Sequence, residues 1–487
     1  MTLSLLKHWQ VLHVSGQLTD NNQKRIVIIG AGIAGLSTAF LLRDFGRKNG
    51  FQFDLKILES AQRHGGATRT DISEGYLCEW GPNGFLDNEP TTFDLVKKLE
   101  LDSELVKANE NSNKRYIFHG GALRKLPIAP PAFLVSDILP LPSRLRVLME
   151  FFIAKKTKNS DETVDSFARR RLGDGFAKYL LDPMVSGIFA GNTKELSLKS
   201  VFPKMVEMER EHGGLFKAMI AKKAAAKKYN TTSGGPSGPN AILHTFKTGM
   251  GHLTDTLADS LSGSIKLNQP VTSVNRENGK FRVFVEKRSF EADFVILACP
   301  SFAAADMIKD ISNPVSDAIR GIYHAPVDVV CHGHHSSGSE FDPNGFGVLI
   351  PRSEGIRSLG TLWSNSIFPG QAPNGDFLLR TIIGGAHDPQ IVELNEDLLH
   401  RTAAQDHKLV MGIQSEAIFK QVFRHKKGIA QYNIGHSIKV AASEQLEKDL
   451  PGLYFTGASY RGVSVNGCIK DAFRIANDFK KLVGKCQ

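Results

Sequence analysis

The segment Lys24-Arg-Ile-Val-Ile-Ile-Gly-Ala-Gly-Ile-Ala-Gly-Leu-Ser-Thr-Ala-Phe-Leu-Leu-Arg43 predicts a buried strand, a glycine turn and an apolar helix. The β-branched run 26–29 is the pattern of a parallel strand covered on both faces. Gly30, Gly32 and Gly35 follow with the spacing G-x-G-x-x-G, which suits a tight turn, close approach to a pyrophosphate and close helix packing. The amides at the start of the helix would face phosphate charge. The segment therefore predicts an α/β, dinucleotide-binding unit.

A second predicted strand, 53–58, strengthens this interpretation because it ends in Glu59. An acidic side chain at that place can accept a hydrogen bond from a ribose hydroxyl. A glycine motif alone would be weak, and a plain glycine turn in another α/β unit is the alternative. The strand, the helix and the acidic residue together favour a dinucleotide.

A second glycine pair identifies the dinucleotide. Arg63-His-Gly-Gly-Ala-Thr-Arg69 resembles the R-x-G-G signature of flavoproteins in the amine oxidase and phytoene desaturase superfamily, whereas a flexible Gly-Gly turn is the alternative. The resemblance implies FAD in place of NAD, in a Rossmann-like domain. It implies FAD contacts from Gly30, Ala31, Gly32, Ile33, Ala34, Gly35, Glu59, Ser60, Gly66 and Ala67.

Length and composition limit the number of domains and the class of binding partner. A chain of 487 residues suggests two or three domains, and 60 Lys and Arg against 50 Asp and Glu give a net charge of +10. This charge favours an anionic substrate or an anionic lipid surface; we expect no nucleic-acid partner because zinc spacings and recognition motifs are absent. The five cysteines are scattered, which fits a reducing cytosol.

Two further regions bear on metal binding and on membrane insertion, and we expect neither. His332, His334 and His335 resemble metal ligands, but the adjoining Gly and Ser residues predict a loop without a matching carboxylate or cysteine, so we expect no metal. Residues 1–23 read as an extension without a cleavage site, and no apolar run of about 18 residues predicts a membrane span. Any membrane contact would then be peripheral.

The bent segment Cys78-Glu-Trp-Gly-Pro-Asn-Gly-Phe-Leu-Asp87 resembles porphyrinogen oxidases of heme synthesis. The resemblance implies that Asn83 lies beside the isoalloxazine ring, although an ordinary turn is the alternative. The implied flavin contacts in this segment are Gly81, Pro82, Asn83 and Gly84.

Residues 95–230 change to helical patterns and predict an inserted, mainly helical domain. It begins with Arg115-Tyr-Ile-Phe-His-Gly-Gly-Ala-Leu-Arg-Lys-Leu-Pro127, which predicts two strands joined by a Gly-Gly hairpin. The same segment resembles the porphyrinogen oxidase pattern, and this implies that Arg115 pairs with a substrate propionate. A solvated surface arginine is the alternative.

Two apolar segments with basic neighbours could anchor this insertion on an anionic membrane. The first, 128–152, precedes Lys155, Lys156 and Lys158, and the second is 217–228. A solvated charged face or packing between domains is the alternative for both. We expect a cytoplasmic protein attached peripherally to the inner face of the inner membrane.

The most specific segments are Asp161-Glu-Thr-Val-Asp-Ser-Phe-Ala-Arg-Arg-Arg-Leu-Gly173 and Leu181-Asp-Pro-Met-Val-Ser-Gly-Ile-Phe-Ala-Gly-Asn192, followed by Leu196-Ser-Leu198. On these the chain is identified as a member of the oxygen-dependent protoporphyrinogen and coproporphyrinogen III oxidase family. Membership implies that Gly187 lies on the wall of the substrate cavity.

The remaining segments complete an α/β architecture, α+β overall, in which three parts of the chain form the FAD-binding domain. We expect the parts 24–94, 241–309 and 435–487, separated by the insertion 95–230, a linker at 231–240 and a substrate-binding mixed sheet at 310–434. The resemblance implies substrate contacts from Phe346, Leu349 and Ile382, for which an ordinary core is the alternative. It implies further flavin contacts from Val271, Ala458, Val463, Ser464 and Val465.

The implied chemistry needs positioning more than a reactive side chain, because hydride would pass from the tetrapyrrole to flavin N5. We therefore predict no catalytic side chain. The family reaction is a six-electron oxidation of protoporphyrinogen IX with O2 as acceptor and three H2O2 formed, or alternatively the same oxidation of coproporphyrinogen III. Two rival functions are an amine or carotenoid oxidase, in which Tyr460 could form half of an aromatic cage, and a flavin-carrying scaffold without turnover. A homodimer and handover to a chelatase are further expectations.

Overall fold

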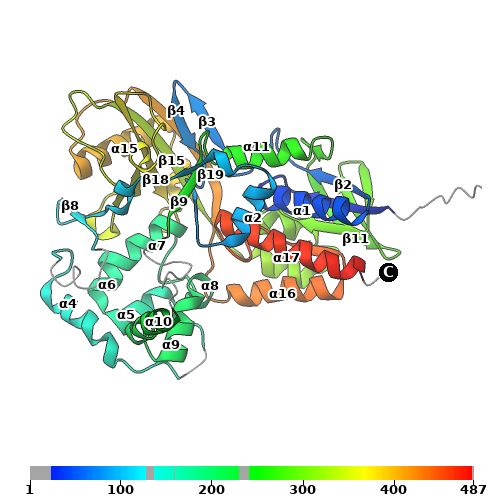
Figure 1. Cartoon of the computed structure of the whole chain (residues 1–487), viewed down its shortest axis with the longest axis horizontal. Coiled ribbons are helices and arrows are strands. Elements are labelled where there is room, and N and C mark those ends of the chain that lie inside the picture. The colour runs from blue at the N-terminus through cyan, green and yellow to red at the C-terminus, as the bar shows by residue number, and fades with distance from the viewer. Residues whose placement is uncertain (1–22, 128–135, 158–159, 230–240, 485–487) are drawn as a thin grey trace, which may run out of the picture.

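The structure is a computed structural model that describes residues 23–127, 136–157, 160–229 and 241–484. The predicted extension 1–23, apart from Gln23, and the predicted linker 231–240 lie outside the described residues, as do residues 128–135 of the first predicted membrane segment, 128–152. Figure 1 shows a layered α/β body, a second sheet beside it, and a cluster of helices at the lower left.

The glycine motif opens a five-stranded parallel sheet of order β10-β2-β1-β14-β20. Ile28 of β1 pairs with Ile57 of β2 and with Ile296 of β14, so the β-branched run lies at the centre of the sheet, as its pattern predicts. The strands are β1 (Lys24–Ile29), β2 (Phe53–Leu58), β10 (Ile265–Lys266), β14 (Phe294–Leu297) and β20 (Leu453–Phe455).

Helices and a small sheet cover the two faces of this parallel sheet. The helices α1 (Ile33–Asn49) and α17 (Val465–Gly484) lie side by side and share one core with α11 (Gly251–Ser260) (Figure 1). The opposite core contains residues of the three-stranded sheet, which consists of β11 (Val271–Glu277), β12 (Lys280–Val285) and β13 (Arg288–Ala292). Elements near these layers are α2 (Pro90–Lys98), α12 (Ser301–Met307), α13 (Asn313–Arg320) and α16 (His436–Asp449).

A seven-stranded mixed sheet has the order β19-β15-β18-β17-β16-β7-β8. Its strands are β7 (Arg115–His119), β8 (Ala122–Lys125), β15 (His324–His335), β16 (Gly347–Leu349), β17 (Ser358–Trp363), β18 (Asp376–Gly384) and β19 (Phe419–Ala430). The hairpin β7–β8 forms as predicted and joins this sheet through parallel pairing of β7 with β16. The residues around Arg115 therefore extend the sheet that carries Leu349.

The predicted loop at the histidines is wrong. His332, His334 and His335 lie on the twelve-residue strand β15, which pairs with β18 and β19. Gly333 is compatible with the strand because its missing side chain leaves room for the ring of Tyr76, which a Cβ would approach to 2.5 Å. Gly333 thus marks a crowded position within the strand, and the serines after His335 mark the end of the strand.

The helical cluster is built around a buried ion network. Arg171 of α5 and Glu150 are both fully buried and paired, and Arg171 also donates to Glu209 of α9 at 2.9 Å. Glu150 accepts the backbone amides of Leu215 and Phe216 at the start of α10. The helices are α4 (Leu141–Leu148), α5 (Val164–Leu172), α6 (Asp174–Phe176), α7 (Asp182–Phe189), α8 (Leu198–Val201), α9 (Pro203–His212) and α10 (Leu215–Tyr229).

The sixteen-residue helix α15 (Glu396–Met411) packs on the mixed sheet. The shorter elements are α14 (Ser364–Ile367), β3 (Thr70–Ser73), β4 (Tyr76–Glu79), β5 (Phe85–Leu86), β6 (Leu105–Lys107) and β9 (Leu243–Phe246). Across the described ranges, the helices lack the combination of length and apolar character that crossing a bilayer requires.

Candidate flavin and substrate site

The glycine turn has the geometry of a phosphate-binding loop. Gly30 has φ +109° and a Cβ there would lie 2.7 Å from the Ala298 carbonyl oxygen, while a Cβ at Gly35 would lie 2.0 Å from the Gly30 carbonyl oxygen. A Cβ at Gly32 would meet no such obstacle, since its nearest atom would be Gly66 Cα at 3.9 Å. Gly32 also precedes α1 without a side-chain cap, and the first turn of α1 carries no acidic residue. The first amides of α1 are therefore accessible to an anion.

The second glycine pair lies directly on the first turn. The Gly65 amide donates to the Ala31 carbonyl at 2.8 Å, and Gly32 forms an isolated bridge with Gly65. Gly66 has φ +57°, and a Cβ there would lie 3.2 Å from Gly32 Cα. The two loops predicted to follow the diphosphate thus form one continuous backbone surface.

Glu59 closes this surface at the end of β2. Its Oε2 accepts the Ala31 amide at 2.7 Å and its Oε1 accepts the Ala61 amide at 2.8 Å, with the Ser60 hydroxyl at 3.3 Å. Val271 lies next to the same end, because the Gln269 amide donates to the Glu59 carbonyl. Glu59, the predicted ribose contact, and Val271, another predicted FAD contact, are therefore neighbours.

The segment 81–84 places an unsatisfied amide beside these loops. Both Asn83 Oδ1 and Asn83 Nδ2 are buried and lack a hydrogen-bond partner among the described residues. Gly81 packs on Ala67, whose carbonyl oxygen a Cβ would approach to 2.5 Å, and Gly84 packs closely on His244. A buried amide without partners costs free energy unless a ligand satisfies it. This position therefore fits a flavin.

The closing segment between β20 and α17 completes the surface. Ser464 caps α17 by accepting the Gly467 amide at 3.1 Å, and Gly457 approaches Ala34 at the start of α1. Gly467 is tightly packed, since a Cβ there would lie 2.9 Å from Gly462 Cα. The predicted contacts Ala458, Val463 and Val465 flank this turn. The glycine loops, the uncapped start of α1 and the side chain of Asn83, which lacks a hydrogen-bond partner among the described residues, together fit FAD.

A row of apolar residues crosses the mixed sheet; Leu349 and Ile382 in it are half-buried, whereas Gly360 is buried and Ile117 is fully buried. Ile382 of β18 pairs with Gly360 of β17, Gly360 pairs with Leu349 of β16, and Leu349 pairs with Ile117 of β7. Leu349 and Ile382 are partly exposed, whereas most of their strand neighbours are buried. We name Ile382, Gly360, Leu349 and Ile117 the apolar row.

Gly187, the predicted cavity-wall residue, lies against the apolar row. A Cβ at Gly187 would lie 2.6 Å from Leu349 Cδ2. Bidentate pairing of Asp182, at the start of α7, with Arg352 fixes one end of this helix at 2.8 and 2.9 Å. The Ala190 carbonyl, which follows the other end, accepts the Ala386 amide at 2.7 Å.

Arg115 lies at the edge of the row on β7. Its guanidinium carbon is 5.0 Å from the centre of the Phe346 ring, which brings two predicted substrate contacts together. Arg115 is exposed at the surface, yet desolvation by the neighbouring protein lowers its pKa from the ordinary value, and the group stays cationic at neutral pH. Arg115 has no carboxylate partner within the described part of the chain.

Arg380 links the flavin loops to the apolar row. Its side chain is buried and donates to the Glu79 carbonyl at 3.1 Å and to the Gly81 carbonyl at 2.5 Å. Side chains two apart on a strand share a face, so Arg380 and Ile382 point the same way. The face that bears the row is therefore the face that meets the flavin loops.

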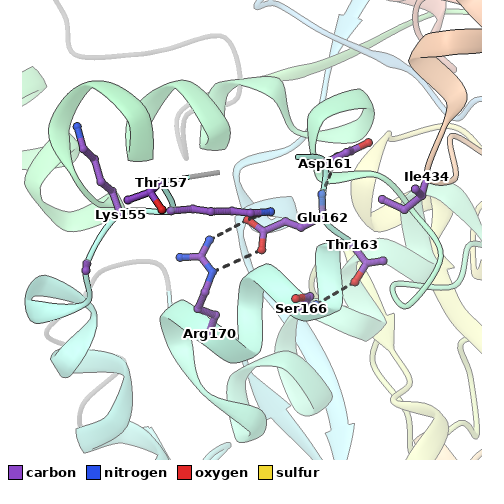
Figure 2. A pocket seen from close by; sticks show the side chains of 10 residues that line it. Lys155, Thr157, Asp161, Glu162, Thr163, Ser166, Arg170 and Ile434 are labelled. Atoms are coloured by element: carbon purple, nitrogen blue, oxygen red, sulfur yellow. Dashed lines mark hydrogen bonds and ion pairs between the residues drawn. The ribbon is translucent and has the colours of Figure 1, made fainter. Parts of the chain in front are cut away.

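A large pocket lies elsewhere, in the helical cluster. Figure 2 shows this pocket of about 720 Å³ between Ala154–Thr157, the start of α5 and Ile434. Among its charged groups, Arg170 donates to Glu162 at 2.8 Å and to Glu209 at 2.7 Å. Its lining includes neither the flavin loops nor the apolar row.

Sequence reasoning missed three residues that hold the site in place. Glu79 accepts the Met250 amide and the Thr70 hydroxyl, both at 2.7 Å, and burial raises its pKa to about 7. Tyr432 accepts the Gly462 amide and donates to the Ala458 carbonyl, both at 2.8 Å. Arg380, described above, is the third. Glu79 lies inside the segment 78–87 that resembles the family, and Arg380 alternates with Ile382 along its strand.

Comparison with known proteins supports the fold. The chain is 29% identical over 477 residues to a coproporphyrinogen III oxidase of Bacillus subtilis (strain 168), covering 94% of this chain and 98% of the relative. It is 28% identical to a chloroplastic protoporphyrinogen oxidase of Nicotiana tabacum, covering 93% and 84%. A crystal structure of a provisionally named protoporphyrinogen oxidase from Exiguobacterium sp. 255-15 has a TM-score of 0.79 at 22% identity, covering 94% and 98%, and shows the same fold.

The family assignment rests on a match over nearly the whole chain. The model for flavin containing amine oxidoreductase matches residues 33–479, which include most of the flavin loops, the apolar row and the start of α17. The cofactor is accordingly FAD, and the chain is an oxidoreductase. The chain belongs to the flavin containing amine oxidoreductase family.

Proposed function

We propose that this protein oxidises protoporphyrinogen IX to protoporphyrin IX with FAD as cofactor and O2 as acceptor. The observation that carries the proposal is the apolar row with Arg115 at its edge, on the face that meets the flavin loops. A tetrapyrrole is a flat apolar disc with carboxylate arms, and the site offers an apolar strip beside a cation that no described carboxylate neutralises. Relatives named for both porphyrinogens support the same substrate class.

The side chains of this site bind and orient. Leu349 and Ile382 would contact one face of the ring, and Gly187 would leave room beside them because it has no side chain. Arg115 would hold a propionate through charge-assisted hydrogen bonds. When bound, FAD supplies the two-electron acceptor for hydride. The protein contributes the fixed approach and a site with little water, in which positioning accounts for much of the rate.

The arginines around the row favour a substrate with few carboxylates. Arg352 is bound by Asp182, and Arg380 is bound by two backbone carbonyls, whereas Arg115 is without an acidic partner among the residues described. Coproporphyrinogen III carries two more carboxylates than protoporphyrinogen IX and would need more cations. We therefore place coproporphyrinogen III second.

The rival reaction, amine oxidation, would use an aromatic cage. Tyr460 is the residue that the sequence offers for such a cage, but it is 2% exposed and packs against Phe455 in the core beneath the parallel sheet. A side chain buried in this way does not line a substrate cavity. The buried Tyr460 thus argues against an amine substrate.

Purified, FAD-loaded protein tests the proposal when it is given each porphyrinogen in air. We expect fluorescent porphyrin from protoporphyrinogen IX faster than from coproporphyrinogen III, with H2O2 formed in step. Yellow protein that converts neither substrate would support the scaffold function and contradict the proposal. Faster conversion of coproporphyrinogen III would reverse the order of the two substrates.

We further propose that the helical cluster attaches to an anionic leaflet. Leu145 and Phe152 are 54% and 80% exposed, and Ile220 of α10 is 62% exposed. Lys217 lies 5.0 Å from the ring centre of Phe151, so the two segments predicted as separate anchors are neighbours. Apolar side chains beside lysines favour binding to anionic headgroups. The expected location is the cytoplasmic side of the inner membrane.

Sedimentation with vesicles tests this attachment. Wild type should bind vesicles that contain phosphatidylglycerol and should be released by salt, whereas phosphatidylcholine vesicles should bind it weakly. Phe152→Ser combined with Ile220→Ser should lose binding. Ile438→Ser on α16 is the control, since Ile438 is 74% exposed but lies on another element. Equal binding by the double variant would contradict the proposal.

A further inference from the structure

Three buried histidines meet between the mixed sheet and α15. His332 and His334 are two residues apart on β15 and therefore share a face, and His407 comes from α15. They are 1%, 3% and 1% exposed. One ring nitrogen of each lies within 4.8 Å of one from each of the others.

Each of these rings is held through one nitrogen, while the other has no partner among the described residues. His332 Nε2 bonds His400 Nδ1 at 2.9 Å, His334 Nδ1 bonds Ser415 Oγ at 3.3 Å, and His407 Nε2 bonds Thr381 Oγ1 at 2.6 Å. The remaining nitrogens, His332 Nδ1, His334 Nε2 and His407 Nδ1, are buried without a hydrogen bond. Histidine ligands of metals show this division, with one nitrogen oriented by a neighbour and the other bound to the ion.

Orphaned nitrogens of this kind are costly in an ordinary core. A buried polar atom without a partner costs roughly 1–3 kcal/mol, and here three occur in one cluster. A cation bound among the three rings would supply such nitrogens with a partner. We propose that His332, His334 and His407 bind one late transition-metal ion, with Zn²⁺ the best match.

The donor set limits the choice of metal. Neutral imidazole suits Zn²⁺, Ni²⁺ and Cu²⁺, whereas Mg²⁺ and Ca²⁺ require oxygen ligands. Three histidines leave the fourth tetrahedral position of Zn²⁺ to water or another small ligand.

The surroundings of the cluster offer access and set its charge. His400 of α15 is partly exposed and bonds His332, so it marks the side from which an ion can reach the buried rings. Lys420 of β19 faces the cluster and opposes a cation, and Glu396 and Asp397 near His400 partly offset it. We therefore expect the three histidines to bind an ion that coordinates imidazole strongly, and not to attract cations in general.

The proposed metal site is separate from the substrate site. His407 bonds Thr381 on one face of β18, whereas the next residue, Ile382, points to the opposite face and belongs to the apolar row. A bound ion would join α15 to β15 and so stabilise the mixed sheet on the face opposite the apolar row. It would not touch the flavin loops, and its loss would not in itself abolish turnover.

The experiment uses the full, FAD-loaded protein after removal of metal with a chelator. Calorimetric titration with Zn²⁺ should show one saturable site per chain, and Zn²⁺ should raise Tm in a concentration-dependent manner. Co²⁺ should give the visible absorption of a tetrahedral site. His334→Gln and His407→Gln should lose the binding, the Tm rise and the Co²⁺ absorption.

His335→Gln is the matched control because His335 lies on the same strand but its side chain is 62% exposed and bonds Asp376. This variant should bind Zn²⁺ as wild type does. Absence of saturable binding of Zn²⁺, Ni²⁺ and Cu²⁺ to wild type, or equal binding by both cluster variants, would overturn the proposal. FAD content and circular dichroism establish that each variant is folded.

X-ray absorption of the zinc-loaded wild type makes the test independent of variants. The expected first shell contains nitrogen and oxygen at about 2.0–2.1 Å. A shell with sulfur at about 2.3 Å would place the ion on cysteines and would contradict the assignment.

Discussion

Gly187 of α7 and Leu349 of β16 are in direct contact, and a Cβ at Gly187 would lie 2.6 Å from Leu349 Cδ2. Two residues that lie far apart in sequence are thereby brought to one wall of the proposed substrate site. The contact is close enough that added atoms at either position must displace the other side chain.

Substitution at this contact should impair porphyrinogen oxidation without affecting the flavin. Gly187→Val should lower kcat/KM by roughly 10–100-fold. The added side chain would overpack the site that holds the ring, which costs about 1–3 kcal/mol. FAD content should stay at the wild-type level. Leu349→Ala should restore part of the activity in the double variant, and a double variant no better than Gly187→Val would contradict the contact as the cause.

Arg115 should contribute to binding more than to turnover. Arg115→Leu should raise KM by roughly 10–100-fold, since a hydrogen bond to a charged group contributes about 1.5–3 kcal/mol. Arg115→Lys should recover part of the loss because it retains the charge without the planar fork. Lys125→Met on the neighbouring strand is the control for general charge. An unchanged KM for Arg115→Leu would remove Arg115 from the site.

Glu79 should make stability depend on pH. Its folded pKa of about 7 lies above the ordinary value of 4.5, because burial disfavours the carboxylate more than Met250, Thr70 and Arg380 favour it. Between these values the folded state keeps a proton that the unfolded state has released, so stability falls as pH rises from about 4.5 to about 7. The fall is at most about 3.5 kcal/mol, at about 1.4 kcal/mol for each unit of pKa.

Denaturant unfolding at pH 5 and pH 8, with FAD at constant excess, measures this effect. Glu79→Gln should flatten the dependence, since glutamine still accepts the Met250 amide and does not titrate. The same slope in both proteins would assign the pH dependence to other groups.

Much of the site was predictable because its parts are local in sequence. Backbone conformation sets the glycine turn, and Gly30, Gly32 and Gly35 reveal it by spacing alone. Gly187 and Leu349 were found only through resemblance, because an apolar residue in a cavity has the same pattern as one in a core. Their contact became visible only once β16, β17 and α7 were assembled.

The rest depended on contacts between distant segments. Glu79 and Tyr432 act on backbone groups of residues 250 and 462, and a single sequence gives no sign of such pairings. The histidines of β15 were predicted on a loop because glycine and serine follow them, but pairing with β18 and β19 outweighs this local preference. His407, the third member of the cluster, lies more than 70 residues away in the sequence.

The ion network of the helical cluster should be essential for its fold. Arg171→Met should destabilise the protein by about 3–5 kcal/mol, because Glu150 would remain fully buried without a cation, whereas Glu209 would keep Arg170 as its partner. Thermal unfolding and protease sensitivity of residues 136–229 report the loss. Arg210→Met on α9 is the control, since its side chain is 70% exposed. A Tm equal to that of Arg210→Met would show that the network contributes little.

Mixing the FAD-loaded protein with protoporphyrinogen IX in the absence of oxygen tests the central claim most directly. The account predicts rapid loss of the yellow flavin absorbance and, on admission of air, return of the absorbance with fluorescent porphyrin. Yellow absorbance that persists with both porphyrinogens, in protein with full FAD content, would contradict it.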